Sequence, residues 1–377
     1  MPETRPVHHG GQARVVGYAL NAFPYHTLAE LWQCLQTDVL ELKARAFPDA
    51  VFPIELRFSE PLVRELASDC QEVAKLKHFL EVHDLALVTV NAFVMPRFHG
   101  EPVKERVYLP AWHESDARTR FTCDSLDLLA QLAPLDAPVK GATTLSVSVP
   151  FGALKPVTMA QIAPSILRCG EYARKLHEKT GTRCVVALEP EPGLTVETTD
   201  EAREFFSAYV PKSLSAYVGV NFDLSHQLVE FENLAESIAT LQRHDIIIAK
   251  VHVSNAAEMP APLRPFYRDS IYLHQTCGVD ATGKRAYFSL DWPTEPPSGE
   301  IVKFRVHYHL PVFPTVTSTT LTEVEQFLRH FSTQALAHST PFIIETYTWP
   351  QQLGGREHLV ENIGRELDWV RQKISLE

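Results

Sequence analysis

Two kinds of hydrophobic pattern alternate along the chain. Short apolar runs rich in β-branched and aromatic residues predict strands, and these lie at 15–23, 52–58, 86–95, 142–149, 183–189, 216–223, 246–253 and 341–348. Between most of them, apolar residues recur every three to four positions. This second pattern predicts helices at 28–44, 61–83, 125–132, 159–180, 201–209, 234–243 and 321–335, with a last helix at 359–373.

Strands that alternate with long helices indicate βαβ units and therefore a parallel sheet. Eight such units predict an α/β fold of the (β/α)8 TIM-barrel type. A doubly wound open sheet is the alternative, but no GxGxxG motif follows the first strand. We therefore expect the barrel.

The domain organisation follows from this count of elements. Residues 1–13 are expected to form a flexible tail, and 14–377 a single barrel domain. A minimal barrel needs about 250 residues, so the 377 residues leave room for long insertions. We expect one insertion after the third strand, at about 96–114, and one after the seventh, at about 260–320. Both leave the C-terminal ends of strands, where barrel enzymes place their active sites.

Composition excludes several classes of protein. The formal net charge is −11, and no cluster of Lys and Arg offers the phosphate contacts that nucleic-acid binding needs. No apolar run approaches the roughly 20 residues that span a bilayer, and the N-terminal residues contain no signal-peptide core. The six cysteines include no CxxC pair. These features predict a cytoplasmic protein that binds neither nucleic acid nor membrane.

Polar residues follow the apolar runs of the last four predicted strands. Glu189 ends the fifth, Asp223 ends the sixth, His252 lies in the seventh and Glu345 lies in the eighth. In a barrel these side chains converge on one mouth, where buried carboxylates are costly unless they are paired or bind a cation. Mixed carboxylate and imidazole ligands suit Mn, Zn, Fe, Co or Mg. Taken singly, each residue could instead be a helix cap, a salt-bridge partner or a core histidine, so the prediction of one divalent metal depends on the joint pattern.

This order of ligands resembles the metal motif of the xylose-isomerase-like barrel superfamily, which includes sugar isomerases, ketose 3-epimerases and enzymes of the endonuclease IV type. The resemblance covers about residues 15–375. It implies that Glu189, Asp223, His252 and Glu345 hold a divalent metal, and that Glu189 and Glu345 are the catalytic acid and base. It also implies that His226, in the Asp-x-x-His motif, contacts the substrate.

Several strings also resemble the EboE-like "metabolite traffic" family of Ebo gene clusters. They are GYALNAFP, FHGEPVKERVYLPAW, LEPEPG, FDLSHQLVEFE, KVHVSNA, YLHQ, FRVHYHLPVF and ETYTW. This resemblance implies a place in a secondary-metabolite pathway and partner proteins of that pathway, but no defined activity.

Further polar and aromatic side chains are candidates for substrate binding. Arg305, His307 and His309 alternate along one predicted strand and therefore share a face; the alternative is a surface hairpin. Lys250 shares its parity with His252, and a structural ion pair is the alternative to a role in the site. The complete set of candidate substrate-binding residues is His226, Glu191, Lys250, Arg305, His307, His309, His99, Asn21, His274, Tyr347 and Trp349.

Three functions fit this chemistry. The first is a metal-dependent isomerase or epimerase of a small hydroxylated metabolite, in which one of Glu189 and Glu345 removes a proton and the other returns one. The second is a non-catalytic protein that binds and carries the metabolite on the same barrel. The third is a metal-dependent hydrolase or phosphoesterase. A homodimer formed through the barrel loops is also expected, although the sequence leaves the oligomeric state open.

Overall fold

The computed structural model describes residues 14–133, 144–261, 270–293, 300–313, 319–331, 339–348 and 358–375. Eight parallel strands close into a barrel in the order β1-β12-β7-β6-β5-β4-β3-β2. The strands are β1 (Val16–Ala19), β2 (Phe52–Arg57), β3 (Leu85–Asn91), β4 (Leu145–Pro150), β5 (Cys184–Glu189), β6 (Val218–Asp223), β7 (Ile247–Val253) and β12 (Phe342–Ile344). The (β/α)8 barrel predicted from the sequence is confirmed.

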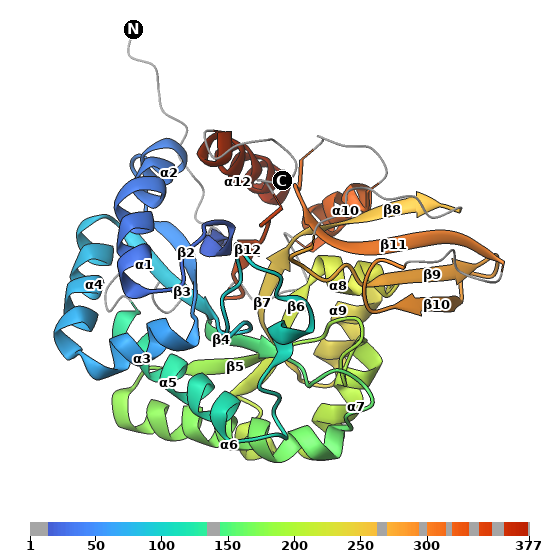
Figure 1. Ribbon diagram of the computed structural model, residues 1–377, viewed down its shortest axis with the longest axis horizontal. Coiled ribbons are helices and arrows are strands. Elements are labelled where there is room, and N and C mark those ends of the chain that lie inside the picture. Colours follow the sequence, from blue (N-terminus) through green and yellow to red (C-terminus); the bar gives the residue numbers. More distant parts are fainter. Residues whose placement is uncertain are drawn as a thin grey trace, which may run out of the picture.

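Helices surround the barrel (Figure 1). They are α1 (Leu28–Cys34), α2 (Leu40–Ala46), α3 (Glu60–Ser68), α4 (Cys70–Val82), α5 (Ala117–Leu132), α6 (Met159–Thr180), α7 (Thr199–Tyr209), α8 (Leu224–Val229), α9 (Leu234–Arg243), α10 (Leu321–Phe331) and α12 (Leu359–Ser375). Short turns of 3-10 helix lie at Leu20–Ala22, Lys104–Tyr108 and Lys212–Leu214, and a π-helical turn at Leu35–Val39. None of the helices in the described ranges is long and apolar enough to cross a membrane.

Some element boundaries differ from those expected. The stretch 61–83 forms two helices because Asp69 caps the second one, accepting hydrogen bonds from the backbone N–H groups of Gln71 and Glu72. The first barrel strand ends at Ala19, since the chain turns into a 3-10 helix at Leu20. The helix expected at 125–132 begins eight residues earlier, at Ala117.

Side chains of the barrel strands alternate between two environments, as β5 illustrates. Val186 and Leu188 belong to the main apolar core, which also contains residues of the surrounding helices such as Ile166 and Phe205. Val185 and Ala187 lie in a separate small cluster. Glu189 shares the parity of that second set, so the period of two carries its carboxylate to the C-terminal mouth of the barrel.

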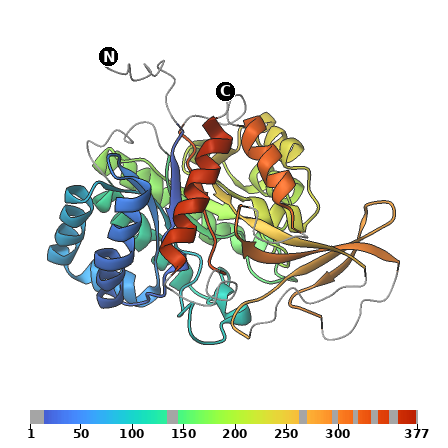
Figure 2. The same cartoon turned by 90° about the horizontal axis from the view of Figure 1, so that it is seen from above.

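A second sheet follows β7. Its antiparallel strands have the order β10-β9-β11-β8 and comprise β8 (Asn255–Pro260), β9 (Thr276–Asp280), β10 (Arg285–Ser289) and β11 (Ile301–Leu310). The sheet lies beside the barrel next to α8 and extends outward from it (Figures 1 and 2). Its longest strand, β11, brings histidine side chains back to the barrel mouth.

Candidate metal centre and cavity

Four neighbouring barrel strands present the predicted ligands at one place. Glu189 ends β5, Asp223 ends β6, His252 lies near the end of β7 and Glu345 directly follows β12. The sheet register pairs Asp223 with His252, and His252 with Ile343 two residues before Glu345. One ligand atom from each of the four buried side chains lies within 4.8 Å of the others.

The Nδ1 atom of His252 lies at the centre of this group. It is 2.9 Å from Oε2 of Glu345, 3.1 Å from Oε1 of Glu189 and 3.5 Å from Oδ2 of Asp223. Burial alone would lower the pKa of His252, but the carboxylates of Glu345, Glu55 and Glu189 raise it well above its ordinary value. Glu189, Asp223 and Glu345, which face Nδ1, would bind a metal ion together with this nitrogen.

The other nitrogen of His252 is held by a carboxylate on the side away from the ligand group. Its Nε2 lies 3.1 Å from Oε1 of Glu55, a fully buried carboxylate that also pairs with Lys250. Lys250 in turn donates to Oγ of Ser148 at 2.9 Å. Glu55 and Ser148 lie on β2 and β4, which are not neighbours of β7, so these contacts cross the interior of the barrel. A histidine whose outer N–H donates to a carboxylate presents its other nitrogen to a metal in a fixed orientation.

Two amides hold the carboxylate of Glu345. Its Oε1 accepts hydrogen bonds from the Nδ2 groups of Asn21, at 2.6 Å, and Asn91, at 3.1 Å. Burial raises the pKa of Glu345, but the facing imidazoles of His252 and His309 lower it below its ordinary value. Glu345 is therefore held as a carboxylate, with Oε2 directed at the ligand group.

The donor set fits a divalent ion. Oε2 of Glu189 and Oδ2 of Asp223 are buried and have no hydrogen-bond partner among the described residues. Buried carboxylate oxygens without partners are costly, and a cation bound between them would remove this cost. Three carboxylates and one imidazole suit Mn²⁺, Mg²⁺, Fe²⁺, Co²⁺ or Zn²⁺.

A cavity opens beside this group. Its empty volume, mouth included, is about 580 Å³. The residues that line it are Asn21, Arg57, Asn91, Phe93, Val94, Phe98, Val107, Tyr108, Glu189, Glu191, His226, Tyr272, Leu273, Gln275, His307, His309, Glu345 and Tyr347. The lining thus combines polar groups, two of the candidate ligands among them, with aromatic and aliphatic groups.

Glu191 is a second buried carboxylate at the cavity wall. Its Oε1 accepts hydrogen bonds from Oη of Tyr108 and Nε2 of Gln275, both at 2.8 Å. Burial raises the pKa of Glu191 to about 7, against the opposing effect of His226. The Glu191 carboxyl is thus held in place by two hydrogen bonds at the cavity wall.

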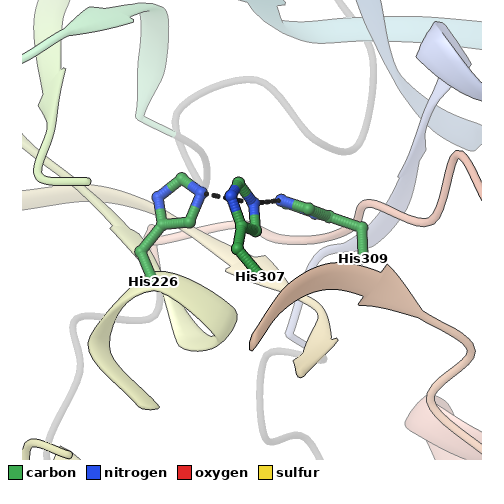
Figure 3. A group of neighbouring side chains, drawn as sticks. All are labelled: His226, His307 and His309. Atoms are coloured by element: carbon green, nitrogen blue, oxygen red, sulfur yellow. Dashed lines mark hydrogen bonds between the residues drawn. The ribbon is translucent and has the colours of Figure 1, made fainter. Parts of the chain in front are cut away.

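Three histidines of the cavity lining meet close to the candidate ligand Glu345 (Figure 3). His226 comes from α8, and His307 and His309 come from β11 of the second sheet. Nε2 of His307 lies 3.2 Å from Nε2 of His226 and 2.7 Å from Nε2 of His309. The rings of His309 and Tyr347 also pack against each other, with their centroids 4.7 Å apart.

Most of the candidate residues converge on this cavity, and some lie elsewhere. Asn21, Glu191, His226, His307, His309 and Tyr347 line it with the catalytic candidates. Lys250 is buried behind His252. Arg305 extends over α8, where it pairs with Glu258 and Glu323.

Two further histidines lie behind the cavity wall, and one candidate is not placed. His99 contacts Oη of Tyr272 and the backbone oxygen of Asn21, each at 2.6 Å. His274 packs on the ring of Tyr308 at a centroid distance of 4.2 Å. Trp349 lies outside the described residues.

Several polar residues that support the site were not predicted from the sequence. Glu55 holds His252, Asn91 holds Glu345, and Tyr108 and Gln275 hold Glu191. Glu55 could have been recognised from the sequence, because it is a carboxylate within a predicted strand whose other residues, apart from Arg57, are apolar. Tyr108 and Gln275 could not, because they lie outside the predicted strands and come together only through the tertiary fold.

Comparison with known proteins shows the fold. No protein-family model and no curated protein matches the chain. The structure is similar to a xylose isomerase-like TIM barrel protein from Mycobacterium smegmatis in complex with magnesium, with a TM-score of 0.54, 15% identity, and coverage of 96% of this chain and 97% of that chain. It is also similar to the IOLI protein with a bound zinc atom, with a TM-score of 0.52, 14% identity, and coverage of 96% and 100%.

A third similar structure is the probable 3-DHS dehydratase AsbF, involved in petrobactin synthesis, from Bacillus anthracis. Its TM-score is 0.52 and its identity 11%, and the match covers 94% of this chain and 97% of that chain. These three likenesses show a (β/α)8 barrel fold, and two of the three similar structures contain a divalent metal.

Proposed function

We propose that the protein is a divalent-metal-dependent isomerase or epimerase of a small hydroxylated metabolite of the sugar type. The observation that carries the proposal is the placement of Glu189 and Glu345. Both carboxylates line one cavity, and each has an oxygen about 3 Å from the same nitrogen of His252. Two carboxylates beside one metal position can act as general base and general acid, one removing a proton from a carbon and the other returning it.

Glu189, Asp223, His252 and Glu345 would hold the metal. A bound divalent ion would polarise neighbouring oxygens of a hydroxycarbonyl substrate and stabilise the negative charge that develops on proton removal.

The chain's own residues supply positioning and proton transfer. Asn21 and Asn91 hold Oε1 of Glu345, so Oε2 faces Nδ1 of His252 beside the cavity, where it would exchange a proton with the substrate. Glu189 has one oxygen near His252 and one without a hydrogen-bond partner among the described residues. Glu191, Tyr108 and Gln275 would orient substrate hydroxyls, while Phe93 and Phe98 exclude water from the far wall.

The resemblance to the EboE-like family supports a finer proposal, in which the substrate is a precursor in a secondary-metabolite pathway and pathway proteins are its partners. The structural similarity to a probable dehydratase involved in petrobactin synthesis is consistent with a metabolite of this kind. Carriage of the metabolite without turnover is the competing function on the same cavity.

Deuterium exchange tests the proposal. The manganese-loaded protein is incubated in D₂O with a panel of ketoses, polyol-derived ketones and their phosphates, and mass spectrometry measures deuterium in the recovered sugars. We expect carbon-bound deuterium with at least one member of the panel, and loss of exchange in Glu189→Gln and Glu345→Gln. Glu325→Gln is the matched control, since Glu325 forms ion pairs on the surface with Arg329 and Lys373.

The outcomes separate the candidates. Exchange that survives both site variants would contradict the assigned roles. A ligand that binds and protects the protein without any exchange would favour carriage. Release of phosphate from the phosphorylated members without exchange would favour the hydrolase.

A further inference from the structure

The contacts of the three histidines in the cavity wall determine which ring nitrogen of each carries the hydrogen. His226, His307 and His309 direct their Nε2 atoms at one another, at 3.2 Å and 2.7 Å (Figure 3). Each side chain is almost fully buried, with 2–5% of the residue exposed. The Nδ1 atoms point away from this group and are called the outer nitrogens here. Their contacts decide which of the rings carry a proton at Nε2.

Every outer nitrogen faces an oxygen that can only accept. Nδ1 of His226 lies 3.0 Å from the backbone oxygen of Pro190, and Nδ1 of His309 lies 3.1 Å from the backbone oxygen of Glu345. Nδ1 of His307 lies 2.7 Å from Oε1 of Gln275. An Nδ1 atom in such a contact carries the hydrogen.

The orientation of the Gln275 amide is fixed independently. Its Nε2 group lies within hydrogen-bond distance of Oη of Tyr108, Oε1 of Glu191 and the backbone oxygen of Pro192, at 2.8, 2.8 and 3.3 Å. The amide nitrogen must point toward these oxygens, so Oε1 is the atom that faces His307. All three imidazoles are therefore held as Nδ1–H tautomers.

In the neutral state this arrangement directs three Nε2 lone pairs at one another. Lone pairs at 2.7–3.2 Å repel unless a cation lies between them. Imidazoles whose Nδ1–H donates to a carbonyl oxygen, and whose Nε2 is free, are oriented as metal ligands are in proteins. One ligand nitrogen from each ring lies within 4.8 Å of the other two.

We propose that His226, His307 and His309 form a second metal site, which takes a borderline transition-metal ion such as Zn²⁺ or Co²⁺. Three imidazole nitrogens and no carboxylate select such ions over Mg²⁺ or Mn²⁺. Because all three histidines line the cavity, the fourth coordination position faces the space in which a substrate would lie. The site goes beyond the proposed function, which needs only the carboxylate-rich site.

The charge around the cavity favours a second cation. The buried carboxylates here are Glu55, Glu189, Glu191, Asp223 and Glu345. Among the described residues, Lys250 and Arg57 are the buried Lys and Arg side chains that contact or line this region. When Glu191 is ionised, one divalent ion and both charged basic groups leave one carboxylate in excess, and a second cation at the histidines would offset this charge.

A single proton shared among the rings is the competing explanation, since one imidazolium could donate to its neighbours. The two explanations differ in metal stoichiometry. Metal-free protein is saturated with Co²⁺ and passed through a desalting column, and elemental analysis then gives the ratio of cobalt to protein. We expect two equivalents for the wild type, one for His307→Ala and one for Glu345→Gln.

The matched control is His99→Ala, which removes a half-buried imidazole whose two nitrogens both contact oxygens. It should keep two equivalents. One equivalent in the wild type that is unchanged in His307→Ala and lost in Glu345→Gln would overturn the second site and leave the first intact. One equivalent that is lost in His307→Ala and kept in Glu345→Gln would instead overturn the carboxylate site on which the proposed function depends.

A spectroscopic readout covers the case in which His307→Ala does not fold. Glu345→Gln is loaded with one equivalent of Cu²⁺, and electron paramagnetic resonance detects the directly bound nitrogens. Splitting from three imidazole nitrogens is expected. Splitting from a single nitrogen would place the ion at His252 and overturn the proposal.

Discussion

The buried pair of Glu55 and Lys250 provides a quantitative test of how the barrel supports its metal site. Both side chains are completely buried, and Glu55 also contacts Nε2 of His252 at 3.1 Å. Glu55→Gln keeps the shape of the side chain and a hydrogen-bond partner for His252, but it removes the negative charge. The variant should therefore affect the stability of the fold and metal affinity by separate routes.

The loss of stability comes from Lys250. Removing one partner leaves a buried ammonium group without its counter-charge, and breaking a buried ion pair in this way typically costs about 3–5 kcal/mol. The loss of affinity comes from His252, because the neutral amide no longer polarises the imidazole or fixes its tautomer. Loss of such a supporting contact typically weakens metal binding by about 10–100-fold.

The double variant Glu55→Gln/Lys250→Met separates the two effects. Methionine removes the unpaired charge and fills most of the same volume, so the free energy of unfolding in urea should return to within about 1–2 kcal/mol of the wild-type value. Metal affinity, measured by competition with a chelating dye, should stay low. The reasoning would be refuted if Glu55→Gln kept wild-type affinity, or if the double variant recovered affinity together with stability.

Three further predictions concern the fold. Trp112→Ala should lower the free energy of unfolding in urea by about 3–5 kcal/mol, because Trp112 is 1% exposed and its loss leaves a cavity; a loss below about 1 kcal/mol would show that its surroundings do not pack as described. Gly219→Ala should destabilise the barrel, since the added Cβ would lie 2.6 Å from the backbone oxygen of Ile247. Gly364→Ala should be neutral or stabilising, because its Cβ meets only a flexible arginine side chain. Equal melting temperatures for the two variants would contradict this difference. Burial, with a smaller effect from nearby arginines, lowers the pKa of His99 to about 3. The unfolded state therefore binds a proton first as the pH falls, and the free energy of unfolding should decrease by up to about 1.4 kcal/mol per pH unit below about pH 6.5. Urea unfolding of His99→Gln should show a weaker pH dependence, and an unchanged dependence would show that His99 does not cause it.

The sequence predicts the barrel because its local patterns agree with its global architecture. Most strand positions are apolar and the helices have an amphipathic period, as the core residues of β5 and α6 illustrate. Boundaries were less accurate where a single side chain decided them. Asp69 caps a new helix within the stretch expected to form one helix. Such a side-chain contact changes only a few residues, so the hydrophobic period of the whole stretch does not reveal it.

The cluster of Glu189, Asp223, His252 and Glu345 was expected because strand order alone brings the ends of neighbouring parallel strands together. Their roles as metal ligands remain predictions. Contacts that cross the barrel could not be read from local patterns. The sequence leaves Lys250 open between substrate binding and a structural ion pair, and the structure places it against Glu55, 195 positions away in the chain.

The strand that carries Arg305, His307 and His309 shows a different limit. A period of two correctly indicates a shared face, yet it does not say what that face covers along its length. In the structure His307 and His309 reach the cavity, whereas Arg305 lies over α8 and contacts the backbone oxygen of Leu228. Which of the three side chains reach the cavity depends on how the second sheet is placed, and the strand pattern does not show this.

The central claim, a divalent metal held at the barrel mouth by four side chains, is tested most directly by anomalous diffraction from crystals soaked in Mn²⁺. The account predicts an anomalous peak at bonding distance, about 2.0–2.3 Å, from oxygens of Glu189, Asp223 and Glu345 and from Nδ1 of His252. Crystals saturated with Mn²⁺ that show no peak among these four side chains would contradict it.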